Sequence, residues 1–312
     1  MDPDEHPLQL RRTLLAQGVG DSDVRRAIKN QQLMAIRPGI YTEPTTYREL
    51  GPADRHRLAI RAAVEKTSTD AVISHESAAI MHGFTLWHDN VERVHFSIDR
   101  SAGGRRSPLR HVHASPFTAD DITVIDGIRV TSAARTVADL ARTMSFESAV
   151  CVGDSALRQG KTTKADAIDL LTDSSRIRGV DHGLRALRFL DGRSESVGES
   201  RSRIYLQRNG FPPPILQASI YDEHGVFIAR PDFLWDGVIG EFDGRIKYTE
   251  LLLPGQNASD VIAAEKARED RLRALGWCVV RWTWDELRGR ELARRLRTNF
   301  SIAATLPSPS DR

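Results

Sequence analysis

The segment at residues 230–248 constrains the fold of this chain more than any other stretch of its sequence. Residues 228–235 are apolar and rich in β-forming side chains, and residues 238–242 form a second run of this kind. Between the two runs stands Asp236 followed by Gly237, a dipeptide typical of two-residue turns. Two β-prone runs joined by such a turn predict a β-hairpin.

Carboxylate side chains accompany both strands of this predicted hairpin. Because side chains alternate along a strand, Glu241 and Asp243 leave the second strand on the same face. Asp232 stands on the first strand, which the tight turn holds beside the second. Isolated buried charges are costly, so such a cluster indicates a bound hard cation, a shared proton or a solvated cleft. The structural alternative is a solvated hairpin with ordinary acidic residues.

The order of these residues resembles the PD-(D/E)XK nuclease fold, and most closely its mismatch-repair (Vsr-like) endonuclease branch. The resemblance runs from about residue 195 to residue 287. Residues 198–203 resemble the first helix of that domain, which contributes a glutamate in the family, and Glu199 is the match. Residues 265–276 read as an amphipathic helix with a glycine stop, followed by a buried strand, as at the end of that branch.

The resemblance implies metal-dependent phosphodiester hydrolysis. A divalent ion polarises a phosphate oxygen and lowers the pKa of the attacking water, and Mg²⁺ or Mn²⁺ takes oxygen ligands. We expect Asp232 and Glu241 as ligands, supported by Glu199 and Asp243. In the family a lysine lies two residues beyond the glutamate, whereas Asp243 holds that place here. Lys247 is therefore the candidate to orient phosphate or water.

Length and charge set the outer limits of the interpretation. A chain of 312 residues is expected to form two or three domains. With 44 Lys and Arg against 42 Asp and Glu, the net charge is +2, so any nucleic-acid site must be a local patch. Cys151 and Cys278 are far apart in the sequence, so we predict that each is a core residue and that they form no metal or disulfide framework. The acidic N-terminal residues lack the apolar stretch of a signal peptide. No apolar run is long enough to span a membrane, so we predict a soluble cytoplasmic protein.

The first part of the chain has the pattern of a winged helix-turn-helix. Residues 8–17 have helical periodicity, which Gly18 and Gly20 interrupt. Asp21 or Ser22 then caps a second helix to about Asn30. A short apolar strand with a basic turn follows at residues 33–41, in the place of a wing.

Double-stranded DNA is the partner that this first part predicts. Arg and Lys outnumber Asp and Glu between residues 8 and 41, which favours contact with phosphates. The second helix is expected to bury Val24 and Ile28, and Arg37 is expected at the tip of the wing. The predicted DNA-binding residues are Arg25, Arg26, Lys29, Asn30 and Arg37. The alternative is a small helical cap that packs on its neighbour.

This arrangement resembles the N-terminal domain of the AbiEi-family antitoxins of type IV toxin–antitoxin systems. The likeness covers about residues 8–169. Residues 72–83 resemble a helix start in that family, and residues 128–140 resemble its later strand-to-helix element. The resemblance implies a transcriptional regulator and a cognate toxin encoded nearby.

Histidines gather in the middle of the chain. His95 stands on a predicted strand at residues 94–98, and His111 and His113 stand on a second at residues 109–113, beyond a basic loop. No acid or thiol accompanies them at ligand spacing, so we expect strand-face histidines with ordinary partners. The same expectation holds for His75 and His82, which share one face of a helix.

The sequence therefore predicts an α+β multidomain protein. The expected divisions are a winged helix-turn-helix at 1–50, an antitoxin-like mixed α/β domain with a helical end at 51–190, a PD-(D/E)XK-like domain at 191–300 and a disordered tail at 301–312, with a polar linker at 191–196. The leading hypothesis is a DNA-binding, antitoxin-like regulator. The alternatives are a Mg²⁺-dependent DNA endonuclease targeted by its winged helix, and a toxin-neutralising protein that binds no nucleic acid.

Overall fold

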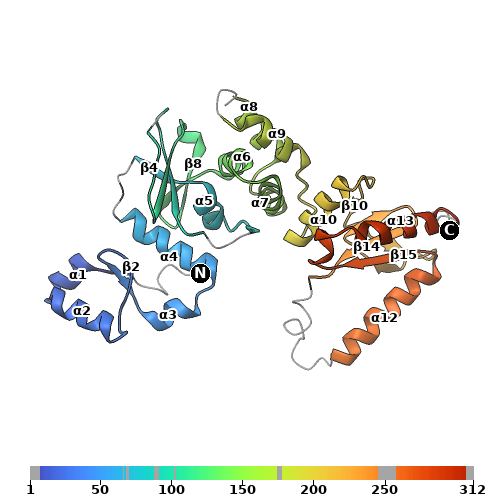
Figure 1. Ribbon diagram of the computed structural model, residues 1–312, viewed down its shortest axis with the longest axis horizontal. Helices are drawn as coiled ribbons and strands as arrows, with labels where there is room; N and C mark the ends of the chain where they lie inside the picture. Colours follow the sequence, from blue (N-terminus) through green and yellow to red (C-terminus); the bar gives the residue numbers. More distant parts are fainter. Residues whose placement is uncertain are drawn as a thin grey trace. The chain divides into compact units, whose positions relative to one another are not determined.

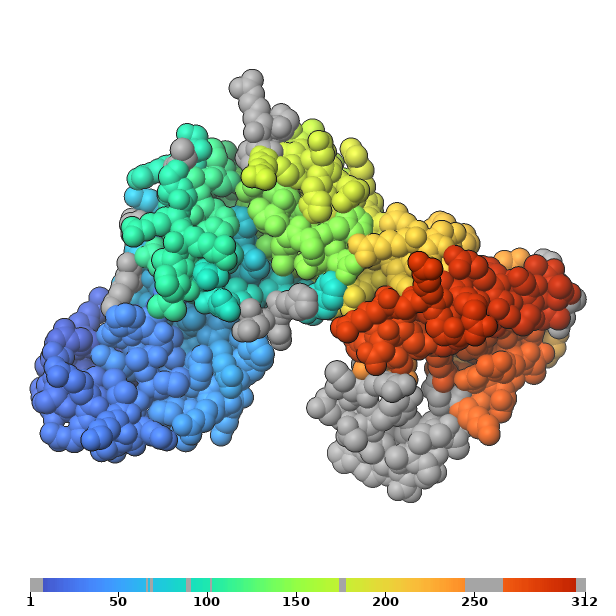
Figure 2. Space-filling view, viewed as in Figure 1, coloured from blue at the N-terminus to red at the C-terminus, as the bar shows by residue number. Residues whose placement is uncertain are grey.

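The computed structural model describes residues 8–65, 67, 70–87, 91–101, 103–173, 178–244 and 258–306, without the side chains of 258–265. The protein has a mixed α+β architecture and divides into two compact units, Met1–Leu190 and Asp191–Arg312 (Figure 1). In the space-filling view of Figure 2, the first unit is coloured blue to yellow-green and the second yellow to red. Each unit is described by itself.

The first unit opens with two helices and a small antiparallel sheet of strand order β1-β3-β2. Its elements are β1 (Gln9–Leu10), α1 (Arg11–Ala16), α2 (Asp21–Lys29), β2 (Met34–Arg37) and β3 (Ile40–Thr42). Acidic side chains lie in the first turn of α2 and basic ones in its last turn, which stabilises the helix through its dipole. Leu14, Val24 and Tyr41 form the core beneath these elements.

A larger mixed sheet follows, with strand order β6-β7-β5-β4-β9-β8. Its strands are β4 (Ala71–Ile73), β5 (Val94–Ile98), β6 (Arg105–Arg106), β7 (Arg110–Ala114), β8 (Ile122–Ile125) and β9 (Ile128–Thr131). The helices α3 (Pro44–Glu49), α4 (Pro52–Val64) and α5 (His75–His82) precede or interrupt it. Residues from α4, α5 and the sheet share one hydrophobic core, which includes Ile60, Met81 and Phe96.

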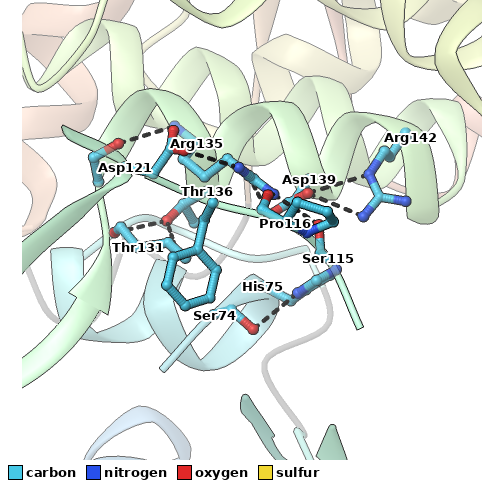
Figure 3. Close-up of polar contacts among 12 residues, drawn as sticks. Ser74, His75, Ser115, Pro116, Asp121, Thr131, Arg135, Thr136, Asp139 and Arg142 are labelled. Carbon is cyan, nitrogen blue, oxygen red and sulfur yellow. Dashed lines mark hydrogen bonds and ion pairs between the residues drawn. The ribbon is translucent and has the colours of Figure 1, made fainter. Parts of the chain in front are cut away.

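The remaining helices of the first unit pack closely together. They are α6 (Ala133–Thr143), α7 (Phe146–Arg158), α8 (Lys164–Asp173) and α9 (Val180–Phe189). At the start of α6, the buried Arg135 donates to Asp121 at 3.1 Å and to Asp139 at 3.0 Å, and also to Ser115 and Pro116 (Figure 3). A buried cation is tolerated here because two carboxylates and two further acceptors surround it.

The second unit is built on a sheet of strand order β10-β13-β14-β15. Its elements are α10 (Val197–Arg208), β10 (Ile215–Leu216), β11 (Ile220–Tyr221), β12 (Phe227–Ala229), β13 (Phe233–Trp235), β14 (Val238–Phe242), α12 (Ala258–Ala274), β15 (Cys278–Trp282) and α13 (Glu291–Ala303). The pair β13 and β14 is antiparallel, with Trp235 opposite Val238 across the turn, so the predicted two-residue hairpin is confirmed. Strand β15 runs parallel to β14.

Helices cover both faces of this sheet. Side chains of α10 and α13 share a core with Phe233 and Trp282, whereas Leu272 of α12 packs with Ile239 from the opposite face of β14. The approach of α10 to the sheet requires a glycine, because a Cβ built on Gly198 would lie 1.9 Å from the ring of Phe242. This contact sets the position of Glu199, the residue that follows Gly198.

Several expected elements differ from those observed. The first hairpin strand is two pieces, because β12 pairs with β11 and only β13 pairs with β14. The first helix begins at Arg11, after β1 has paired with β3. Ile28 is 38% exposed and Val24 is buried, so the prediction of two buried residues on α2 holds only for Val24.

The chain between and after the units also differs from expectation. Ser194, in the segment predicted as a linker, is buried and accepts a hydrogen bond from Arg203, so this segment packs within the second unit. Helix α13 runs to Ala303 and so extends into the predicted disordered tail. Residues 307–312 lie outside the described residues. None of the helices in the described part of the chain is both long and apolar enough to cross a membrane.

Candidate functional sites

The predicted acidic cluster is built around one glutamine side chain in the second unit. The Nε2 of Gln217 donates to Oε2 of Glu199 at 3.0 Å and to Oδ1 of Asp232 at 3.2 Å. The backbone N–H of Phe242 donates to the other oxygen of Asp232 at 2.8 Å. Glu199 on α10 and Asp232, just before β13, are therefore brought together as predicted. Gln217 was not predicted as part of the site, and its backbone has a left-handed φ of 55°.

Burial changes the ionisation of Asp232. Desolvation, followed by the negative charge of Glu199, raises the pKa of Asp232 to about 7, and Glu241 adds to the effect. The hydrogen bonds from Phe242 and Gln217 oppose the rise but do not cancel it. Asp232 is thus a carboxyl group that exchanges a proton near neutral pH, as acidic clusters at metal and catalytic sites often do.

Glu241 is held differently. The Nε of Arg281 donates to its Oε2 at 2.7 Å, and a guanidinium nitrogen of Arg268 lies 3.7 Å from its Oε1. Arg281 stands opposite Glu241 in the parallel pair of β14 and β15. Asp243 follows β14, and its backbone N–H donates to the carbonyl of Trp282 at 2.8 Å. The arginines were not predicted, because they come from elements beyond the hairpin.

Three carboxylates of the predicted cluster differ in their surroundings. Both oxygens of Glu199 already accept hydrogen bonds, from Ser196 at 2.8 Å and from the backbone of Glu195 at 2.7 Å, and Ser196 is the N-cap of α10. Asp232 is desolvated and repelled by its neighbours, which a cation relieves. Both oxygens of Glu241 are also engaged, Oε2 by Arg281 and Oε1 by Arg268. Lys247 lies outside the described residues.

The predicted DNA-contacting residues on α2 are at the surface. Arg25, Arg26, Lys29 and Asn30 are all exposed, whereas Val24 on the same helix is buried. Arg26 forms an ion pair with Asp23 at 3.4 Å, in which both side chains remain exposed. Such exposed pairs are weak and exchange readily for a phosphate.

Arg37 is placed differently from the other four. Its guanidinium donates to the backbone carbonyl of Leu109 at 2.9 Å, and its side chain is half-buried. Burial, followed by the positive charge of Arg110, lowers the pKa of Arg37. Arg37 therefore joins the hairpin of β2 and β3 to the segment before β7, instead of standing free at the tip of the hairpin.

The structure also assembles a histidine pocket that the sequence analysis discounted. His75, His95, His111 and His113 line a pocket of about 410 Å³ together with Glu76. The Oε2 of Glu76 lies 3.0 Å from Nδ1 of His95, so α5 supplies an acid that the spacing of these histidines in the sequence does not indicate. His82 does not line the pocket. Its Nε2 lies 2.8 Å from the backbone carbonyl oxygen of Thr131.

The pairing of two strands explains why the pocket was missed. Strands β5 and β7 are parallel, with His95 opposite His111 and Ser97 opposite His113. Because residues opposite each other share a face and residues two apart share a face, His95, His111 and His113 all leave the same side. The alternation of histidines is visible in the sequence. The sequence does not show the strand register that aligns these histidines, or that Glu76 of α5 lies beside them.

The protonation states in this pocket suit metal binding. Desolvation, followed by the charge of His75, lowers the pKa of His113 to about 2, and desolvation also lowers the pKa of His111. Burial raises the pKa of Glu76, but the hydrogen bond and charge of His95 outweigh it and the net pKa falls to about 2. His75 is buried, and burial lowers its pKa to about 4. Near neutral pH His75, His111 and His113 are therefore neutral imidazoles and Glu76 is a carboxylate.

No protein-family model matches the chain. Two uncharacterized proteins of Mycobacterium tuberculosis, Rv2248 and MT2308 from two strains, are similar to it, each 27% identical over 224 residues, or 71% of this chain and 78% of the relative. Among solved structures, the crystal structure of the RV2827C protein from Mycobacterium tuberculosis matches at 12% identity with a TM-score of 0.39, over 72% of this chain and 87% of that chain. None of these names states an activity.

Proposed function

We propose that this protein is a DNA-binding transcriptional regulator of the antitoxin-like type, in which α2 contacts the phosphates of duplex DNA. The observation that supports the proposal is the surface of α2. Arg25, Arg26, Lys29 and Asn30 are exposed on a helix whose apolar Val24 is buried. The helix thus presents three cations and an amide to solvent without having to unfold or repack.

Binding through phosphates has a measurable signature. Each neutralised phosphate releases condensed counterions, so the logarithm of the affinity falls with the logarithm of the salt concentration, by roughly 0.9 per contact. A helix that contributes contacts from several cations should therefore bind duplexes of many sequences at low salt. Preference for one operator needs base contacts in addition, for which Asn30, at the C-terminal cap of this helix, is the candidate.

The test is fluorescence anisotropy with duplex DNA from the promoter of the protein's own gene, over a range of salt concentrations. Arg25→Ala/Arg26→Ala should weaken binding about equally for all sequences and reduce the salt slope by roughly one unit per lost contact. Arg188→Ala, at an exposed arginine of α9, is the matched control and should leave the slope unchanged. Wild-type protein that binds no duplex at low salt would contradict the proposal and favour a protein partner, such as a cognate toxin.

A second function is supported by the acidic cluster of the second unit. We infer that Asp232 and Glu241 bind Mg²⁺ or Mn²⁺, with Gln217 and Glu199 holding Asp232 in place. The ion, when bound, supplies the polarisation of a phosphate oxygen and an activated water. Asp232, whose pKa is raised to about 7, releases its proton when it binds the ion. Arg281 and Arg268 beside Glu241 offer positive charge to a phosphodiester.

This second function is tested by incubating supercoiled DNA with the protein and either Mg²⁺ or Mn²⁺. Nicking by the wild type that is absent with chelator, and lost in both Asp232→Asn and Glu241→Gln, would support it. Asp270→Asn, which changes an exposed carboxylate on α12, is the matched control and should cleave like the wild type. Absence of cleavage with either metal, in protein that still binds DNA, would contradict hydrolysis at this cluster and leave regulation as the proposed activity.

A further inference from the structure

We propose that His95, His111, His113 and Glu76 form a site for a divalent transition metal, with Zn²⁺ as the ion that best fits the donor set. The site lies in the first unit and is independent of the acidic cluster and of α2. Its donors are imidazole nitrogens and a carboxylate oxygen, which are the side-chain atoms that bind Zn²⁺ outside thiolate sites. Mg²⁺, in contrast, prefers oxygen ligands and water.

The spacing of the donor atoms supports this assignment. Ligand atoms of His95, His111 and His113 all lie within 4.8 Å of one another. The Nδ1 of His95 is 3.1 Å from Nε2 of His113 and 3.0 Å from Oε2 of Glu76. A tetrahedral ion with bonds of about 2.0–2.1 Å holds neighbouring donor atoms about 3.3 Å apart. The separations of Nδ1 of His95 from Nε2 of His113 and from Oε2 of Glu76 are therefore close to those that coordination requires.

Hydrogen bonding alone satisfies this arrangement poorly. Nδ1 of His95 faces both the carboxylate of Glu76 and Nε2 of His113. If Nδ1 carries a proton, that one proton must serve two acceptors. If Nδ1 is unprotonated, its lone pair faces the negative oxygen of Glu76. A cation removes the conflict, because it accepts all of these lone pairs at once.

The donors are also held in place by their neighbours. The backbone N–H of His95 donates to Oγ of Ser77 at 2.9 Å, and the same hydroxyl meets Nε2 of the buried His56 at 2.8 Å. The ring of His75 stacks on that of His113, with centroids 3.6 Å apart. Groups that orient metal ligands in this way lower the cost of binding.

His75 adds a second, independent observation. It is 1% exposed, and its Nε2 finds no hydrogen-bond partner in the part of the chain that the structure describes. Its Nδ1 lies 3.0 Å from Oγ of Ser74 (Figure 3). Its backbone has a φ of 52°, in the left-handed region, where a non-glycine residue is strained. An unpartnered buried nitrogen and local strain in the same pocket are typical of a ligand site.

The experiment is a titration of the full-length, tag-free protein, stripped with chelator, with Zn²⁺ and with Co²⁺. Isothermal titration calorimetry and metal analysis after dialysis should give one Zn²⁺ per chain, and Co²⁺ should produce the visible absorption of a four-coordinate ion with nitrogen ligands. His111→Ala/His113→Ala should weaken Zn²⁺ binding more than tenfold, since it removes two ligands. Glu76→Gln keeps the size of the side chain and should shift the Co²⁺ spectrum.

Two matched variants make the result specific. His82→Ala removes a histidine that lies outside the pocket and should bind Zn²⁺ like the wild type. Asp270→Asn changes an exposed carboxylate of the second unit and should also leave Zn²⁺ binding intact. Circular dichroism establishes that each variant is folded. Wild-type protein that retains no Zn²⁺, or a Co²⁺ spectrum that is the same in Glu76→Gln, would overturn the proposal.

Discussion

Asp232 shows how the surroundings of a single residue decide its charge. Its pKa is raised to about 7 because burial and the negative charge of Glu199 both disfavour the ionised form. The folded state therefore holds a proton that the unfolded chain releases near pH 3.8. Between about pH 4 and pH 7 the native state binds more protons than the unfolded state, so stability falls as pH rises. Above pH 7 the contribution of this proton to the stability of the folded state is lost completely.

Asp232→Asn should remove this dependence. We expect the free energy of unfolding of the wild type to decline from pH 4 to pH 7 relative to that of the variant, by on the order of 4 kcal/mol at pH 8. Denaturant titrations at several pH values measure it. Because an asparagine offers only one acceptor oxygen to Gln217 and Phe242, the pH dependence is the readout, and not the absolute stability. Parallel curves for the two proteins would show that Asp232 is ionised throughout.

Helix α10 illustrates the same dependence at the scale of an element. The start of α10 is determined by neighbouring residues: the hydroxyl of Ser196 accepts a hydrogen bond from the backbone N–H of Glu199 and donates one to the Glu199 carboxylate. The distance of α10 from the sheet depends on a residue far away in the sequence, because Gly198 lies against the ring of Phe242 on β14. Through that contact the helix places Glu199 beside Gln217.

Gly198→Ala should therefore destabilise the second unit. The new Cβ would lie 1.9 Å from the Phe242 ring, which overpacks the core at a cost of about 1–3 kcal/mol. In a Phe242→Leu background the same substitution should cost less, and thermal unfolding of the four proteins gives the coupling between the two sites. Gly51→Ala, whose Cβ meets nothing within 4 Å, is the control. Equal costs in both backgrounds would place the strain elsewhere.

The whole molecule consists of two units with separate cores. The first unit contains the core around Phe96, and the second contains the cores around Trp282 and Leu272. Leu190, at the end of the first unit, is buried, and a Cβ on Gly153 would lie 2.5 Å from its side chain. Asp191 begins the second unit, whose Ser194 is also buried. Leu190 and Ser194 are therefore both buried on either side of the boundary between the units.

Each unit should fold when produced alone, provided that the cut follows Leu190. Fragments 1–190 and 191–312 should each unfold cooperatively, within a few degrees of the corresponding transition of the full chain, because no core is divided. Differential scanning calorimetry measures this. A cut after Ser196 instead separates Ser194 and the cap of α10 from the second unit and should destabilise it. An unfolded 191–312 fragment would show that this unit depends on the first.

Local patterns in the sequence determined most of the elements and some of the residues that meet. The turn at Asp236 and Gly237, the helix at Glu199 and the exposed cations of α2 follow from propensity, capping and periodicity, which act over a few residues. Tertiary structure alone decided which distant groups neutralise or complete a site. Arg281 reaches Glu241 only because β15 pairs with β14 in parallel. His95, His111 and Glu76 meet because strand register and helix packing are set by the burial of apolar side chains across the whole fold, which no short window of sequence contains.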